Sequence, residues 1–154
     1  MISTYRIVVG VDGTPASIAA LRWAFRHAYA RRGSVQAVCV WPWDTREIVH
    51  AEARQAECEA MLSEAITTAL ADNPRVPVSG RAVAGRSAYE LAKAAQQADL
   101  LVLGSHGRSR IAHAVLGGVA ETCVRLSTVP VVVLPHREPV LATQPASALS
   151  AVPG

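Results

Sequence analysis

Short apolar runs alternate along the chain with longer segments in which apolar residues recur every three or four positions. A continuous apolar run is typical of a strand buried on both faces, and a spacing of three or four is typical of a helix with one buried face. The runs predict strands at 7–11, 35–41, 76–84, 99–103 and 129–134. The longer segments predict helices from Pro15 to a stop at Gly33 and over 46–71, 87–97 and 118–126. This alternation predicts an α/β fold, a five-stranded parallel sheet flanked by four helices.

Local signals mark the ends of two of these helices. Thr14 has a side chain that caps helices and Pro15 suits the first helical position, whereas Gly33 favours a stop. Ser87 and Glu90 have the spacing of a capping box before the third helix. The residues expected on the buried faces of the first two helices are Ile18, Leu21, Phe25, Ala28, Leu62, Ala65, Ile66 and Ala69.

The residues that follow the predicted strands mark the expected binding site. In open parallel sheets, ligands bind beyond the carboxyl ends of the strands, where the strand order reverses. We therefore expect a site at the rim marked by Asp12, Trp41, Gly85 and Gly104. Asp12 is expected either to accept a hydrogen bond from a ligand or to cap the turn before the first helix. Trp41 is expected in the core, and the sequence leaves the role of Trp43 open.

The last strand predicts both an edge of the sheet and contact with a second copy. Pro130 has no backbone N–H, so the strand suits an edge position. An edge this apolar needs a cover, and we expect a homodimer through Val129, Val131 and Val133. Residues 137–154 are rich in Pro, Ala and Ser and are expected to form a tail outside a single domain of residues 1–136.

The composition argues against several classes of protein. With 51% apolar and 18% charged residues, the chain is too hydrophobic for disorder, and no apolar run is long enough to span a membrane. The net charge is +3 and the basic residues are scattered, so we expect neither a nucleic acid nor a membrane as a partner. The preference for Arg over Lys indicates a GC-rich genome, and we expect a bacterial source.

The cysteines and the start of the chain bear on its compartment. Cys39, Cys58 and Cys123 are odd in number, lie far apart and form no C-x-x-C pair, so neither a disulfide framework nor a zinc site is predicted. The first residues do not resemble a signal peptide. We therefore expect a protein of the reducing cytoplasm.

Motifs of the common enzyme classes are missing from the sequence. It contains no NTPase phosphate loop, no dinucleotide-binding G-x-G-x-x-G, no zinc-protease H-E-x-x-H and no hydrolase G-x-S-x-G. His106 and His113 have no third ligand nearby, so no metal site is predicted. Ser105 and His106 are neighbours in sequence, and because neighbours rarely face each other, no catalytic residue is predicted either.

A series of glycines follows the fourth strand and continues to the start of the last helix. Gly104 and Gly107, and then Gly117 and Gly118, allow backbone N–H groups to approach an anion, and a helix N-terminus favours phosphate. Arg108 adds positive charge. Any one of these glycines, taken alone, is better explained by a tight turn. The whole set, at one edge of the sheet, predicts a site for a small anion.

Around these glycines the sequence resembles the universal stress protein family. The segments that carry the resemblance are 7–13, 98–108 and 129–133. The family pattern G-x2-G-x9-G-[ST] marks members that bind ATP, and Gly104, Gly107 and Gly117 match its spacing. The resemblance covers about residues 4–136. It implies a flavodoxin-like or Rossmann-like sheet, usually a homodimer, with adenine near Asp12 and the phosphates at the glycines.

The resemblance also implies a set of binding residues and a function. The residues expected at the nucleotide are Gly10, Val11, Asp12, Val40, Gly104, His106, Gly107, Arg108, Gly117, Gly118, Val119 and Ala120. The implied function is that of a stress-response regulator that binds ATP, with ADP and AMP as alternatives, and hydrolyses it slowly at most. The only metal this function implies is Mg²⁺ carried by the nucleotide.

Two positions depart from the pattern. Gly118 stands where the family has Ser or Thr, and Ala120 stands where ATP-binding members often have a hydroxyl. Each lost hydrogen bond is worth about 1 kcal/mol, and more with a charged acceptor, so we expect adenine nucleotide binding that is retained but weak. The alternative is a dimeric interaction module that works without nucleotide.

Overall fold

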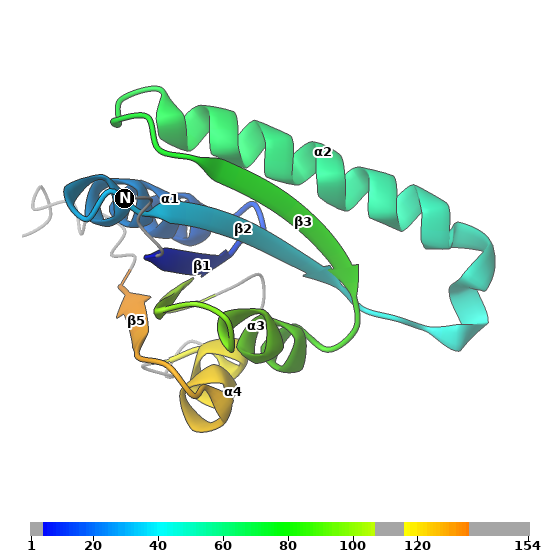
Figure 1. Cartoon of the computed structure of the whole chain (residues 1–154). Coiled ribbons are helices and arrows are strands. Elements are labelled where there is room, and N and C mark those ends of the chain that lie inside the picture. The colour runs from blue at the N-terminus through cyan, green and yellow to red at the C-terminus, as the bar shows by residue number, and fades with distance from the viewer. Residues whose placement is uncertain (1–4, 107–115, 136–154) are drawn as a thin grey trace, which may run out of the picture.

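The computed structural model describes residues 5–106 and 116–135 as a sheet between two layers of helices (Figure 1). Along the chain the elements are β1 Arg6–Gly10, α1 Pro15–Ala30, β2 Ser34–Trp41, the 3-10 helix η1 Thr45–His50, α2 Ala51–Leu70, β3 Val78–Ala84, α3 Ser87–Ala95, β4 Leu100–Gly104, α4 Gly118–Leu126 and β5 Val131–Leu134. The α/β class, the five parallel strands and the four α-helices predicted from the sequence are confirmed for the described residues.

The sheet has the strand order β3-β2-β1-β4-β5, and every neighbouring pair is parallel. The chain first moves from β1 outward to β3, then returns to β1 and continues outward through β4 to β5. The order therefore reverses between β1 and β4, which opens a crevice at their carboxyl ends. β5 is an edge strand, as the sequence predicts, but it begins at Val131, two residues later than predicted.

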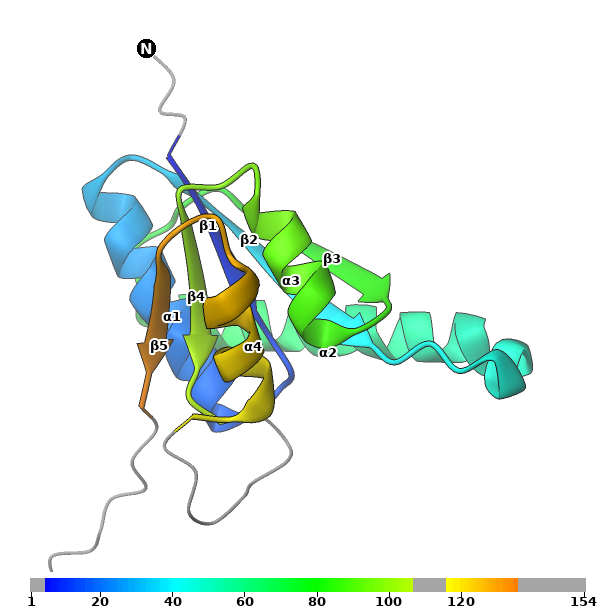
Figure 2. The same ribbon diagram turned by 90° about the horizontal axis from the view of Figure 1, so that it is seen from below.

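The two faces of the sheet are covered by different helices (Figure 2). Ile7 and Val9 are fully buried in a cluster with residues of α1 and α2, whereas Val8 is buried in a second cluster with residues of α3 and α4. Successive side chains of a strand point to opposite faces, so both sets need cover. This burial is the reason why the strands read as continuous apolar runs.

The ends of α1 confirm one signal and correct another. Thr14 caps the helix by accepting a hydrogen bond from the Ser17 N–H, and Pro15 is its first residue, as predicted. The stop comes earlier than Gly33, because Arg32 already has a left-handed backbone with φ 54°. Gly33 is needed for space instead, since a Cβ there would lie 2.6 Å from the Tyr5 carbonyl oxygen.

Two predictions for the middle of the chain are wrong. The segment predicted as one helix over 46–71 divides into η1 and α2. The capping box is absent, because Ser87 is already the first residue of α3 and the N-cap position is taken by Arg86, whose side chain makes no capping hydrogen bond in the described structure. No helix in the described part of the chain is both long and apolar enough to cross a membrane.

The structure also corrects the expectation for the cysteines. Cys39 of β2 and Cys58 of α2 form a disulfide, with their Cα atoms 6.3 Å apart. The sequence gives no sign of this bond, because only the packing of α2 against β2 brings the two residues together. Cys123 is free and fully buried, and burial raises the pKa of its thiol to about 11.

Candidate functional site

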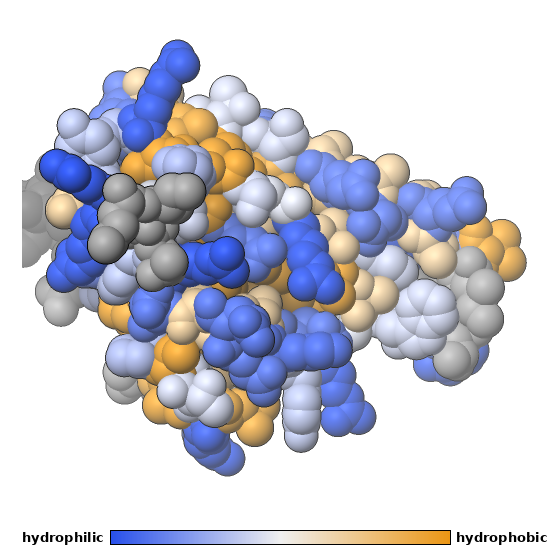
Figure 3. All heavy atoms as spheres, viewed as in Figure 1, coloured by the Kyte–Doolittle hydropathy of each residue, from blue (hydrophilic) through white to orange (hydrophobic). Residues whose placement is uncertain are grey.

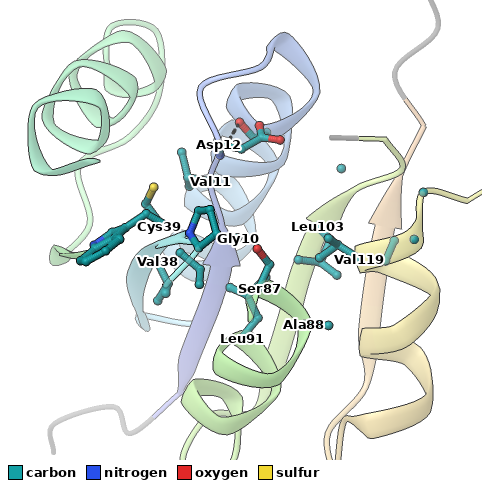
Figure 4. Close-up of a pocket in the computed structure, with 18 of the residues that line it drawn as sticks. Gly10, Val11, Asp12, Val38, Cys39, Ser87, Ala88, Leu91, Leu103 and Val119 are labelled. Atoms are coloured by element: carbon teal, nitrogen blue, oxygen red, sulfur yellow. Dashed lines mark hydrogen bonds between the residues drawn. The ribbon is translucent and has the colours of Figure 1, made fainter. Parts of the chain in front are cut away.

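A cavity of about 890 Å³ opens at the carboxyl ends of the strands, at the reversal between β1 and β4 (Figure 4). Its volume is in the range of small-molecule sites. The predicted residues that line it are Gly10, Val11, Asp12, Val40, Gly104, His106, Gly117, Gly118, Val119 and Ala120. The other two predicted residues, Gly107 and Arg108, lie outside the described residues, as does His113.

Asp12 holds the turn that leads from β1 into α1. Its Oδ1 accepts hydrogen bonds from the Thr14 N–H at 3.0 Å and from the Thr14 hydroxyl at 2.5 Å. Its own N–H donates to the Ser17 hydroxyl at 3.3 Å. Of the two roles that the sequence left open, the structure shows the turn-capping one, and it places the same residue in the cavity wall.

Two of the predicted glycines have close neighbours, which are flexible side-chain ends at Gly10 and include backbone atoms at Gly104. A Cβ on Gly10 would lie 2.7 Å from Leu103 Cδ2 and 3.0 Å from Leu91 Cδ1. A Cβ on Gly104 would lie 2.9 Å from Ala16 Cβ and 3.1 Å from the Ala16 carbonyl carbon. Because the second clash involves backbone, β4 and α1 approach each other this closely only with glycine at position 104.

The start of α4 provides the backbone donors of the site. Gly117 is the N-cap, and its N–H is engaged by the Ser105 carbonyl oxygen at 2.6 Å. The N–H groups of Gly118, Val119 and Ala120 belong to the first turn, where a helix has no carbonyl partners of its own. With the positive end of the helix dipole, they give this wall the character of an anion site. Apart from its chain neighbours and the backbone of its own helix, no heavy atom of the described residues lies within 4 Å of a Cβ built on Gly118.

Ser105 and His106 correct the expectation that sequence neighbours do not face each other. The Ser105 hydroxyl and His106 Nδ1 are 3.2 Å apart, and both residues line the cavity. Ser105 is buried, and its backbone N–H donates to the Leu134 carbonyl oxygen at 2.9 Å. This segment is therefore held against β5 on one side and against the start of α4 on the other.

Sequence reasoning missed the wall of the cavity that α2 builds. Arg54, Glu57, Cys58 and Met61 line it, at the spacing of one helix face. They place one positive and one negative charge beside a disulfide and a thioether. Helical periodicity was the available signal for this shared face, but it does not say that the face covers the ends of the strands.

Trp41 joins this wall to the core. Its side chain packs against the core as predicted, and it also lines the cavity. Its Nε1–H donates to Gln55 Oε1 at 2.7 Å, while Gln55 Nε2 donates to the Ala82 carbonyl oxygen at 3.1 Å. Trp43, which the sequence left open, is about half exposed and its ring centroid lies 5.9 Å from that of Trp41.

The structure brings no three potential metal ligands of the His, Cys, Asp and Glu types together among the residues it describes. The residues that line the described cavity provide apolar walls, backbone donors and a few charges. Its chemistry fits an organic anion with an apolar body, because the backbone donors of α4 are at one end and Val11, Val40 and Met61 are at the other.

Comparison with known proteins places this chain in a family. Residues 4–135 match the model of the universal stress protein family. A universal stress protein of Mycobacterium tuberculosis is 36% identical over 132 residues, which cover 82% of this chain and 44% of that protein. The chain thus spans about half the length of the curated relatives it matches.

Solved structures agree with this placement. A crystal structure of a universal stress protein in complex with cAMP is 28% identical, with a TM-score of 0.68, and the match covers 86% of this chain and 98% of the other. The universal stress protein UspA from Lactobacillus plantarum has the same fold, with a TM-score of 0.67 at 22% identity and coverage of 85% and 97%. The sheet and its helices are therefore those of this family.

Proposed function

The chain belongs to the universal stress protein family, and we propose that its cavity binds an adenine nucleotide as the signal of a stress-response regulator. The proposed ligand is ATP, with ADP and AMP as alternatives. The observation that carries the proposal is the cavity of about 890 Å³ whose far end is the open first turn of α4. The complex of the 28% identical relative with cAMP supports an adenine nucleotide as the ligand class.

The two ends of the cavity suit the two ends of such a ligand. Val11, Val40 and Met61 provide apolar surface for a planar base. The N–H groups of Gly118 and Val119 at the start of α4 suit the phosphates. A nucleotide that spans the cavity would thus contact residues on both sides of the point between β1 and β4 where the strand order reverses.

We expect the binding to be weak because two hydroxyl groups are missing. Gly118 and Ala120 line the cavity and offer only backbone donors there. We expect a dissociation constant of about 0.1 to 1 mM, which corresponds to a binding free energy of only ~4–5.5 kcal/mol. Because a Cβ on Gly118 meets no heavy atom of the described residues within 4 Å, a serine side chain fits at this position.

Isothermal titration of the full chain with ATP, ADP, AMP and cAMP tests the proposal. The wild type should bind at least one of them, and Gly118→Ser should bind ATP about 3- to 10-fold more tightly through one added hydrogen bond to a charged acceptor. Gly118→Ala is the matched control, since it adds the same carbon without the hydroxyl. No heat from any of the four at millimolar concentration would refute nucleotide binding.

The proposed regulator is not an efficient enzyme. We expect ATP turnover well below about one per second, the low end of ordinary enzymes. Phosphate release measured under saturating ATP tests this, and turnover above that rate would contradict it.

The nucleotide-independent interaction module is the second candidate, favoured by the two missing hydroxyls at Gly118 and Ala120. Adenine nucleotide released from freshly purified protein by denaturation, seen at 260 nm, would exclude it.

The proposed assembly is a homodimer that pairs through the edge strand β5. The carbonyl oxygens of Pro130 and Leu134 accept hydrogen bonds from the β4 side. Backbone groups alternate in direction along a strand, so those of Val131 and Val133 point to the open edge. Val133→Pro removes one outward N–H while keeping an edge position that proline tolerates. Light scattering should show a dimeric wild type and a monomeric variant, and a monomeric wild type would refute the assembly.

A further inference from the structure

The disulfide Cys39–Cys58 lies in the wall of the cavity. Cys39 is near the end of β2 and Cys58 is in α2, and both line the cavity with 6% of their surface exposed. Figure 4 shows Cys39 on the side of the pocket away from Leu103 and Val119. A small reductant can thus reach the bond through the cavity, and a ligand in the cavity would stand in its way.

The first two turns of α2 have few other contacts that hold them in place. The buried residues of α2 are Cys58, Leu62, Ala65 and Ala69, and none of residues 51–57 is buried. Figure 1 shows this end of the helix and η1 projecting past the ends of β2 and β3, and Figure 3 shows hydrophobic side chains at the tip. Cys58 is therefore the first buried contact that α2 makes.

Gln55 adds polar contacts between this end of α2 and the neighbouring strands. Gln55 accepts the Trp41 indole N–H at 2.7 Å and donates to the Ala82 carbonyl at 3.1 Å. The N-cap residue His50 makes no side-chain capping bond in the part of the chain that the structure describes. Segments with few buried contacts open locally at low free energy, so this end of α2 depends on its covalent link to β2.

We propose that the Cys39–Cys58 pair is a redox-sensitive site that controls nucleotide binding, because it holds the α2 wall of the cavity in place when oxidised and releases it when reduced. This inference rests on the proposed nucleotide function. In the oxidised chain, Arg54, Glu57 and Met61 are held where a ligand meets them, so little ordering is left to occur on binding. In the reduced chain, that ordering accompanies each binding event and weakens it.

The co-reactant is a dithiol. One of its thiolates attacks a sulfur of the pair, which breaks the Cys39–Cys58 bond and forms a mixed disulfide with the reductant. The second thiol of the reductant then displaces the cysteine. The reductant leaves as its own disulfide, and its two hydrogens end on the two cysteine sulfurs. Two electrons pass to the protein, and oxidation reverses each step.

The third cysteine does not interfere with this exchange. Cys123 is fully buried on the other face of the sheet, and burial raises the pKa of its thiol to about 11. The attacking species in disulfide exchange is the thiolate, which Cys123 hardly forms near neutral pH. Disulfides that form in cytoplasmic proteins are usually catalytic or redox-sensing, so this pair is compatible with the compartment expected from the sequence.

Coupling between ligand and disulfide is reciprocal. If the oxidised chain binds ATP more tightly by some factor, ATP must favour the disulfide over the two thiols by the same factor. We expect a factor of about 3 to 10, the size of a typical weak coupling. Two independent measurements of one number therefore test the proposal.

The experiment titrates ATP into the full chain in its oxidised form and after reduction with dithiothreitol. The oxidised chain should bind about 3- to 10-fold more tightly, and saturating ATP should raise the ratio of reduced to oxidised dithiothreitol that half-reduces the pair by the same factor. Cys58→Ala should bind ATP like the reduced chain, both with and without dithiothreitol. The control Cys123→Ala should show the same change in ATP affinity on reduction as the wild type. Hydrogen exchange over residues 51–57 should rise on reduction even without ATP.

The outcomes separate this proposal from the one on which it rests. Equal ATP affinity of the two redox forms overturns the redox control and leaves nucleotide binding intact. Absence of ATP binding in both forms overturns both for this ligand. Unchanged exchange over residues 51–57, or two free thiols at these positions in air-oxidised protein, also overturns the redox control.

Discussion

Two of the walls of the cavity differ in origin. The wall at β4 and α4 consists of glycines and backbone N–H groups from one stretch of sequence, and most of its described residues could be named from a motif. The wall at α2 consists of side chains from a helix that returns over the sheet, and no motif marks it. The comparison teaches that motifs reveal sites built from backbone, whereas walls built by packing stay hidden in the sequence.

The largest expected effect compares the part of α2 that packs on the sheet with the 3-10 helix η1 that precedes it. Leu62 is 3% exposed in the half of α2 that packs on the sheet, whereas Val49 in η1 is 89% exposed. Leu62→Ala should lower the free energy of unfolding by about 3 kcal/mol, because it leaves a cavity in the core. Val49→Ala, which also shortens an aliphatic side chain, should change it by less than about 0.5 kcal/mol. Urea unfolding measures both, and similar losses would contradict the contrast between the buried part of α2 and the exposed η1.

The next effect compares two glycines of the wall at β4 and α4. Gly104→Ala should cost about 1–3 kcal/mol, because the added Cβ meets Ala16 at 2.9 Å and its carbonyl carbon at 3.1 Å. Gly118→Ala should cost nothing measurable or add a few tenths of a kcal/mol of stability, since the position is helical and open. Thermal unfolding of the two variants distinguishes them. Equal stability would mean that both glycines serve only the ligand.

The smallest effect concerns a region remote from both walls and serves as a reference for them. His27 of α1 stacks on Trp23 with ring centroids 4.5 Å apart, and its Nδ1 lies 3.2 Å from Arg31 Nη1. Burial, and then the charge of Arg31, lower the pKa of His27 below 6.5. The unfolded chain therefore takes up this proton first as the pH falls.

The stability that neutral His27 contributes is consequently complete above about pH 6.5 and declines below it, until the folded protein is protonated as well. Urea midpoints at pH 7.5 and 5.5 should differ more for the wild type than for His27→Gln. Nucleotide affinity should show no such dependence on residue 27, because His27 does not line the cavity. An equal shift of the midpoint in both proteins would contradict the role of His27.

Most of the fold could be predicted because burial on both faces leaves a local record. The helix predicted at 118–126 coincides with α4, and the strand predicted at 35–41 differs from β2 by one residue. The prediction of a capping box failed because the Ser-x-x-Glu spacing does not show whether the serine is the N-cap or the first residue of the helix. In the structure the N-cap is Arg86, which has an extended backbone, and Ser87 is the first helical residue. The long second helix failed because an apolar pattern does not distinguish a 3-10 turn from the α-helix that follows it.

The site divides in the same way. The sequence by itself determined the order of elements, the edge position of β5 and the glycine wall, because period, proline and glycine act through neighbouring backbone. Only the tertiary structure decided that α2 lies over the strand ends, that Cys58 meets Cys39, and that Arg54 and Glu57 line the cavity. The physical reason is that helix packing depends on which side chains interlock across the sheet, and this pairing has no fixed spacing along the chain.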